Sequence, residues 1–170
     1  NKGFFNTKKW LGFSNNLRIE GSYSLSAKAY QFALKKDLKG YQLGEALLGL
    51  AKTFEDQISP IEKNDLIPFF YNDNLFFEDA FQVYSKISPS NLRSSLSIYD
   101  SVLVSIPESS LITEAQFRLA EIQYRIIEDF DKASNLYIAA LSENPPLELK
   151  KKIILRIGDV LLAKGDYNKS

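Results

Sequence analysis

The sequence predicts an all-α protein built as an array of stacked helical hairpins. Three observations support this class: apolar residues recur at helical spacing along most of the chain, strand-like alternation is not sustained, and one pattern of small and aromatic residues repeats. With 170 residues, of which 45% are hydrophobic and 25% are charged, the chain can bury a core and is too apolar for a disordered segment.

The expected helices are joined by short links, which is typical of antiparallel neighbours. A further helix is expected to start near Asp166. The expected helices cover residues 7–20, 23–37, 42–57, 75–87, 92–105, 111–128, 130–143 and 147–163.

The stretch from Ser59 to Asn74 departs from this pattern. Pro60 and Pro68 bracket it, and Pro68 cannot lie inside a helix without the loss of a hydrogen bond. The stretch is either a degenerate repeat helix or a functional insertion. Its aromatic residues are interpreted either as local core or as a docking patch for a partner; they are Phe69, Phe70, Tyr71, Phe76 and Phe77.

The strongest feature is a set of four positions that occurs three times, with offsets of 4, 7 and 12 residues from the first position. A small residue, an aromatic residue one turn later and a second small or medium residue define one close-packed helix face, and the fourth position ends the helix. The copies are Ser26, Tyr30, Ala33 and Leu38; Ser95, Tyr99, Val102 and Pro107; and Ala133, Tyr137, Ala140 and Pro145.

We call each copy of this set a stripe. The helix that precedes each stripe also repeats. Ser14 lies 7 residues before Gly21, and Gly158 lies 7 residues before Gly165. Both glycines are expected to form turns. Trp10, Phe13, Ser14 and Leu17 follow the spacing W-x2-L-G-x2-Y, and the same slot is filled by Leu48 and Gly49, by Leu119 and Ala120, and by Ile157 and Gly158. We interpret Trp10 as a packing residue.

These residues resemble the tetratricopeptide repeat (TPR) family, whose unit is a helix–turn–helix of about 34 residues. The resemblance implies a single TPR-like domain over 1–170, read as a piece of a longer chain. It also implies a right-handed α–α superhelix, in which small residues let helices approach closely. The units would be 7–40, a degenerate 41–91, a second helix at 92–107, a unit at 112–145 with one extra residue before Ala133, and an incomplete 151–170.

The resemblance further implies that the first helix of each unit lines a concave groove. A mixed lining of aromatic, aliphatic and charged groups suits a peptide or a partner helix. A carboxylate clamp of the kind found in some TPR domains is not expected, because Leu11 replaces its first Lys and only Asn15 matches. The implied groove residues are Lys8, Leu11, Asn15, Arg18, Leu43, Leu50, Glu114, Phe117, Glu121, Tyr124, Arg125, Lys152, Leu155 and Asp159, with Ala46 and Thr53 in the same register.

Composition argues against several other functions. The chain has no His and no Cys, so we expect no catalytic residues, no metal and no cofactor. A net charge of +0 argues against nucleic acid as a partner, and no apolar run is long enough to span a membrane. The composition does not indicate a compartment.

The predicted function is therefore that of a scaffold or adaptor that binds a protein or peptide. Two alternatives remain open: a regulatory or docking arm of a larger enzyme, and a structural repeat protein that self-associates through its C-terminal end. The last helix is expected to expose its apolar face.

Overall fold

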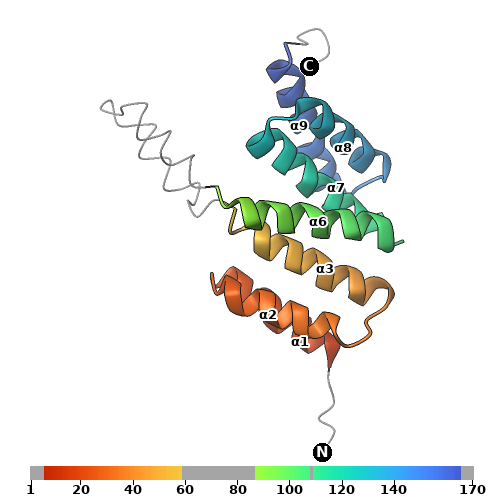
Figure 1. The fold of residues 1–170 in the computed structure, drawn as a ribbon. Helices are drawn as coiled ribbons and strands as arrows, with labels where there is room; N and C mark the ends of the chain where they lie inside the picture. The colour runs from red at the N-terminus through yellow and green to blue at the C-terminus, as the bar shows by residue number, and fades with distance from the viewer. Residues whose placement is uncertain (1–5, 59–86, 108, 166–170) are drawn as a thin grey trace, which may run out of the picture. The chain divides into compact units, whose positions relative to one another are not determined.

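The computed structural model describes residues 6–58, 87–107 and 109–165 (Figure 1). These residues form helices and turns and contain no strand, so the predicted all-α class is confirmed for them. The helices are α1 (Thr7–Ile19), α2 (Tyr23–Leu34), α3 (Gly40–Glu55), α6 (Pro89–Ser105), α7 (Ser109–Ile122), α8 (Phe130–Ser142) and α9 (Leu147–Ala163). A π-helical turn, η1 (Gln123–Ile127), directly follows α7.

The predicted helix positions agree with these bounds to within a few residues. The helix predicted at 23–37 is shorter than expected, because it ends at Leu34 and Asp37 adopts a left-handed φ of +52°. The expectations for Ser59–Asn74, for a helix at 75–87 and for one near Asp166 fall almost wholly outside the described residues.

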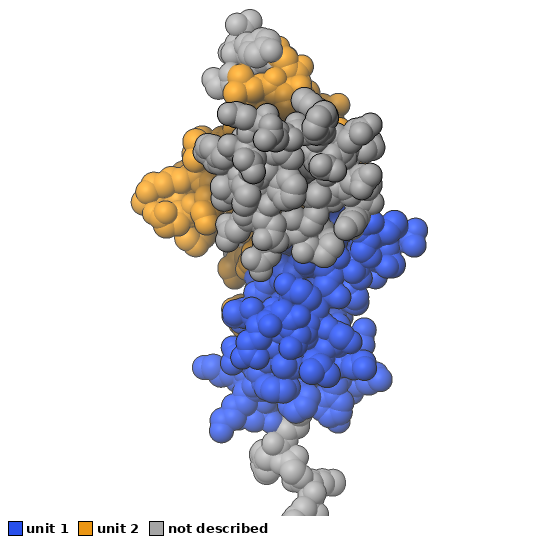
Figure 2. Space-filling model, turned by 90° about the vertical axis from the view of Figure 1, so that its left-hand side faces the viewer, with its two compact units in different colours: residues 1–36, 49–98 blue, residues 37–48, 99–170 orange. Residues whose placement is uncertain are grey.

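The chain forms two compact units, one of residues 1–36 and 49–98 and the other of 37–48 and 99–170 (Figure 2). In the first unit α1 packs against α2 as a helical hairpin. In the second unit α7 packs against α8, and α8 packs against α9. The core of this second unit gathers fully buried residues from all three helices: Ala120, Ala133, Tyr137, Ala140, Ile153 and Val160.

The two glycines that were expected to form turns do so in the same way. Gly21 has a φ of +78° and Gly165 a φ of +77°, a left-handed conformation that favours glycine. The Gly21 amide donates to the carbonyl of Arg18, and the Gly165 amide donates to that of Leu162. These bonds satisfy carbonyls in the last turns of α1 and α9. The left-handed conformation that follows each of these helices accounts for the glycine at both positions.

The repeated stripe is buried in all three of its copies. Tyr30 is 3% exposed, and Tyr99 and Tyr137 are 0% exposed. The small and medium residues of the stripe are also fully buried: Ser26, Ala33, Ser95, Val102, Ala133 and Ala140. The stripe inferred from spacing alone is therefore the packing face of α2, α6 and α8.

The predicted close approach at small residues holds at Gly49. A Cβ placed at Gly49 would overlap the ring of Tyr30, so the aromatic residue of α2 lies directly on the glycine of α3. A Cβ placed at Gly158 would have no described atom within 4 Å. The two glycines are aligned in sequence, and Gly49 is required by a neighbouring side chain; the helix expected near Asp166, which would follow Gly158, lies outside the described residues.

The π-helical turn η1 lies a few residues before Ala133, in the stretch where the sequence pattern has one extra residue. A π-helical hydrogen bond spans five residues where an α-helical one spans four, so one such turn takes up one additional residue. The turn ends at Glu128, which has a left-handed φ of +62°, and the Asp129 amide donates to the carbonyl of Gln123. Asp129 then caps α8 by accepting a 2.9 Å bond from the Lys132 amide.

Candidate partner-binding site

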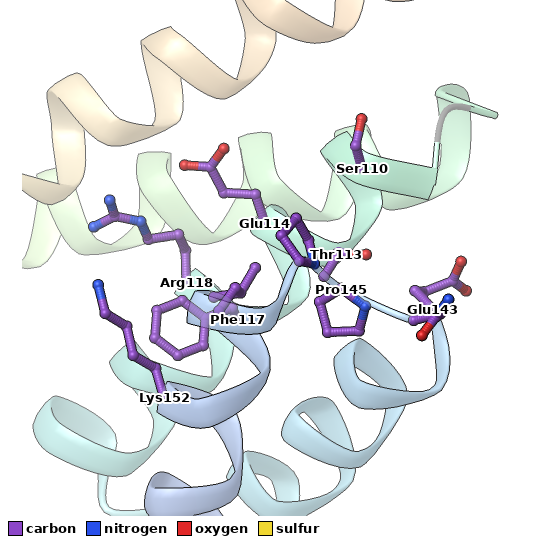
Figure 3. A pocket seen from close by; sticks show the side chains of 11 residues that line it. Ser110, Thr113, Glu114, Phe117, Arg118, Glu143, Pro145 and Lys152 are labelled. Atoms are coloured by element: carbon purple, nitrogen blue, oxygen red, sulfur yellow. The ribbon is translucent and has the colours of Figure 1, made fainter.

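A hollow of ≈ 470 Å³ opens in the second unit between α7, the α8–α9 link and the start of α9 (Figure 3). We call it the α7–α9 hollow. Its walls come from Ser110, Thr113, Glu114, Phe117 and Arg118 of α7, from Glu143, Asn144, Pro145 and Pro146 of the link, and from Leu149 and Lys152 of α9.

The α8–α9 link shapes one wall of this hollow. Asn144 takes a left-handed φ of +52° just after the end of α8, and Pro146 has an extended ψ of 147° just before α9. A proline disfavours helical conformation in the residue before it, so the Pro145–Pro146 pair stops one helix and starts the next. Pro145 is buried. The wall is therefore set by backbone geometry.

An aromatic ring and charges of both signs line the hollow. Phe117 is half-buried, and its ring centroid lies 5.9 Å from that of Tyr137 in the core. In Figure 3 the cationic groups of Arg118 and Lys152 and the Glu114 carboxylate lie toward one end of the hollow, and the Glu143 carboxylate lies toward the other. An apolar surface flanked by charged groups can hold a peptide side chain and orient the segment that carries it.

Three predicted groove residues of the second unit line this hollow together: Glu114, Phe117 and Lys152. Leu43 is half-buried elsewhere in the unit, and Leu155 is 69% exposed. Two other apolar residues of α9, Ile154 and Leu162, are exposed like Leu155, whereas Ile153 and Val160 of the same helix are fully buried.

Glu121, another predicted groove residue, lies at the centre of a polar network that joins α7, α8 and α9. Its Oε1 accepts a 2.6 Å bond from the Tyr137 hydroxyl and a 2.8 Å bond from Arg156 Nε. Arg125 pairs with its Oε2 at 3.3 Å, and Arg156 also donates to Asp159 at 2.9 Å. Most of the bonding capacity of this carboxylate is therefore used within the protein.

This network changes the pKa of two of its members. Burial, followed by the hydrogen bond to Glu121, raises the pKa of Tyr137 well above its ordinary value. Burial opposes the charge of Arg156, but its bond to Asp159 and the charge of Glu121 outweigh burial and raise its pKa. Tyr137 is therefore a neutral donor and Arg156 a permanent cation at physiological pH.

The remaining predicted groove residues are placed differently. Tyr124 packs against Phe130, with ring centroids 6.0 Å apart. In the first unit Arg18 pairs with Asp56 at 2.7 Å and donates to the Asn15 amide oxygen. Lys8 is exposed, whereas Leu11, Leu50, Ala46 and Thr53 are buried. The last four offer little surface to a partner.

Several residues of the hollow were not inferred from the sequence. Arg118 lies one turn after Glu114, and Leu149 lies one turn before Lys152, so helical spacing from the predicted residues could have found both. The link residues Glu143 and Asn144 could not be found this way, because they belong to neither helix.

Among the described residues no group of His, Cys, Asp or Glu could hold a metal ion. None of the described helices is both long and apolar enough to cross a membrane. No protein-family model, curated protein or solved structure matches this sequence. The site is therefore interpreted from its own geometry and chemistry.

Proposed function

We propose that this chain is a protein-binding scaffold of the TPR type, a right-handed α–α superhelix that holds a peptide or a helix of a partner in a concave groove. The observation that carries this proposal is the α7–α9 hollow, which brings together Glu114 and Phe117 of α7 and Lys152 of α9, two helices that the resemblance assigns as first helices of their units. That arrangement is the one the resemblance implied for a groove.

The chemistry of the hollow supports a segment of mixed character as the ligand. The Phe117 ring and the proline wall favour an apolar side chain of the ligand. Lys152 favours an acidic ligand residue one or two turns away from that side chain. The walls belong to helices and to a link of defined geometry, so little ordering is needed on binding.

Site-specific photo-crosslinking in cell extract tests the proposal. A photo-crosslinking amino acid replaces Ser110 at the hollow in one bait and Lys132, an exposed residue of α8 outside it, in the other. Both positions are exposed, so both baits should fold, which circular dichroism can verify. We expect one partner to crosslink to the bait altered at 110 and not to the bait altered at 132.

A charge variant sharpens this experiment. Lys152→Glu should weaken capture of the crosslinked partner, and Lys132→Glu should leave it unchanged, because only Lys152 faces the hollow. Equal crosslinking from both positions, or capture insensitive to Lys152→Glu, would contradict the proposal.

One observation favours self-association as a second candidate function. Ile154, Leu155 and Leu162 on α9 are 51%, 69% and 48% exposed. Apolar side chains grouped in this way often mark contact surfaces. Sedimentation velocity over a range of concentrations tests this candidate, since Leu155→Ser should abolish any oligomer that uses α9.

A further inference from the structure

A second hollow, of ≈ 320 Å³, lies on the α1–α2 hairpin, and we call it the aromatic hollow. Its walls are almost wholly apolar, with one charged residue, Lys28, among them. The residues that matter for its chemistry are Trp10, Phe13 and Leu17 of α1 and Leu25, Lys28 and Phe32 of α2. None of them belongs to the predicted groove.

The walls of the aromatic hollow are fixed by contacts within the hairpin. The Trp10 indole N–H donates a 2.8 Å bond to the carbonyl of Ala29, which holds the ring between the two helices. The Trp10 ring centroid lies 5.0 Å from that of Phe32 and 5.7 Å from that of Phe13. A ligand therefore meets a surface that is already ordered, which lowers the entropic cost of binding.

The apolar side chains of this hollow are exposed beyond what the hairpin needs for its own packing. Phe13 is 50% exposed, Leu25 57% and Phe32 41%. The hairpin already has a separate buried stripe that includes Ser26 and Tyr30. Large apolar residues that cluster on one face mark interaction sites more often than isolated ones do.

The charge of the hairpin indicates the character of the ligand. Residues 7–36 contain six Lys or Arg, of which Arg18 is paired with Asp56, and a single Glu, although the whole chain has a net charge of +0. Lys28 lines the hollow, and Lys36 Nζ lies 4.4 Å from the centroid of the Phe32 ring. The complementary ligand carries acidic groups around an apolar centre.

We propose that the aromatic hollow docks an acidic amphipathic helix of a partner protein, with a large apolar side chain of that helix seated between Trp10, Phe13 and Leu25. A concave, rigid surface fits a protruding side chain. This docking surface is independent of the α7–α9 hollow and of its proposed ligand.

The single tryptophan of the sequence makes this proposal directly testable. Because Trp10 is the only tryptophan, intrinsic fluorescence reports on the aromatic hollow. The probe is a synthetic helix of about 18 residues with Leu and Phe at i, i+3, i+4 and i+7 and Glu elsewhere. Its matched control has Lys in place of every Glu. We expect the acidic helix to shift the Trp10 emission and to bind at least about tenfold more tightly than the basic one.

Variants localise the binding. Lys28→Glu should lower the affinity for the acidic helix by about fivefold or more, and added salt should lower it further. Phe13→Ser and Leu25→Ser should each lower this affinity by about tenfold. Ile138→Ser is the matched control, since Ile138 is a 50% exposed residue of α8, and it should leave the affinity unchanged. Circular dichroism verifies the fold of each variant.

Three outcomes would overturn the proposal. Equal affinity for the acidic and basic helices would remove the electrostatic basis for the partner. A Trp10 shift with phosphatidylglycerol vesicles and none with the acidic helix would assign the surface to a lipid bilayer. Concentration-dependent self-association that Phe13→Ser abolishes, with no binding of the acidic helix, would assign it to a second copy of this chain.

Discussion

The two units use different chemistry at matching positions of the repeat. In the first unit hydroxyl residues link the helices: Ser26 Oγ donates a 2.8 Å bond to the carbonyl of Ser14, and it lies 3.1 Å from Thr53 Oγ1. The matching positions in the second unit are Ala120 and Ala133, which are fully buried without any side-chain hydrogen-bonding group. What repeats along the chain is therefore the spacing of small side chains, whereas their polarity changes.

The polar contacts of the second unit are concentrated elsewhere. Tyr137 and Arg156 both donate to the Glu121 carboxylate, which links α8 and α9 to α7. In the first unit Tyr30 occupies the repeat position of Tyr137 and lies against Gly49. One aromatic position thus serves close packing in one unit and supports a charged network in the other.

The largest effect is expected where Tyr30 meets Gly49. Gly49→Ala should destabilise the protein by about 3 kcal/mol, because the new Cβ overlaps the buried Tyr30 ring and forces the helices apart. In an open helix interior the same change stabilises by about 1 kcal/mol, so the sign itself is diagnostic. Urea denaturation followed by circular dichroism measures the change.

Gly158→Ala is the matched control for this substitution. Gly158 lies inside α9, and a Cβ added there would have no described atom within 4 Å, so the change should be neutral or stabilising by up to about 1 kcal/mol. Equal effects of the two substitutions would contradict the difference between the two glycines.

The next effect concerns the charged network of the second unit. Glu121→Ala should cost about 2 kcal/mol, because the Tyr137 hydroxyl and Arg156 lose their shared acceptor. The cost is limited by the partial exposure of Arg156, whose side chain is 33% exposed. Urea denaturation measures it, with Glu143→Ala at the end of α8 as an exposed control. A cost below about 0.5 kcal/mol would show that water replaces the network.

These helices and their packing stripe could be predicted because they depend on local spacing. The small and aromatic positions of the stripe are buried in every copy, since a period of 3.6 residues places the same positions on one face of each helix. The extra residue before Ala133 was also visible in the sequence, but its conformation was not. A loop and a π-helical turn such as η1 can both take up one residue.

The candidate site was less predictable because it depends on contacts between distant residues. Glu121 was placed in the groove by its register, but Arg156, 35 residues later, pairs with it in the structure. Leu11 and Leu50 were placed there by the same register, although both are buried. Register identifies a helix face, whereas neighbouring helices determine which residues of that face remain accessible.

A smaller effect, and one that depends on pH, is expected for the Tyr137 hydroxyl. Tyr137→Phe should cost about 1 to 1.5 kcal/mol near pH 7, because it removes a 2.6 Å hydrogen bond to a carboxylate. The folded protein raises the pKa of Tyr137 above its ordinary value of 10.0. The contribution of the hydroxyl is therefore fully present below pH 10.0 and is lost as the pH rises further.

Urea denaturation of the wild type and Tyr137→Phe at several pH values measures this dependence. The difference in the free energy of unfolding should stay constant from about pH 7 to 9 and narrow above about pH 10, by at most about 1.4 kcal/mol for each pH unit. Tyr41→Phe, at a tyrosine that is 49% exposed, is the control. A difference that widens above about pH 10 would contradict the raised pKa.

The smallest effects are expected from exchanging the small residues between the two units. Ser26→Ala should cost about 1 kcal/mol, because the carbonyl of Ser14 loses a donor while Thr53 keeps its 2.8 Å bond to the carbonyl of Gly49. Ala133→Ser should change stability by less than about 1 kcal/mol if its hydroxyl reaches the carbonyl of Ala120 in the way that Ser26 reaches Ser14.

Urea denaturation of the two single variants and of the double variant measures this exchange. A buried hydroxyl without a partner costs about 1 to 3 kcal/mol, so a cost above about 2 kcal/mol for Ala133→Ser would show that the α7–α8 contact differs in geometry from the α1–α2 contact. A smaller cost would mean that both hairpins offer the same carbonyl to the same position. Serine and alanine would then be interchangeable there because the backbone of the facing helix supplies the acceptor in either unit.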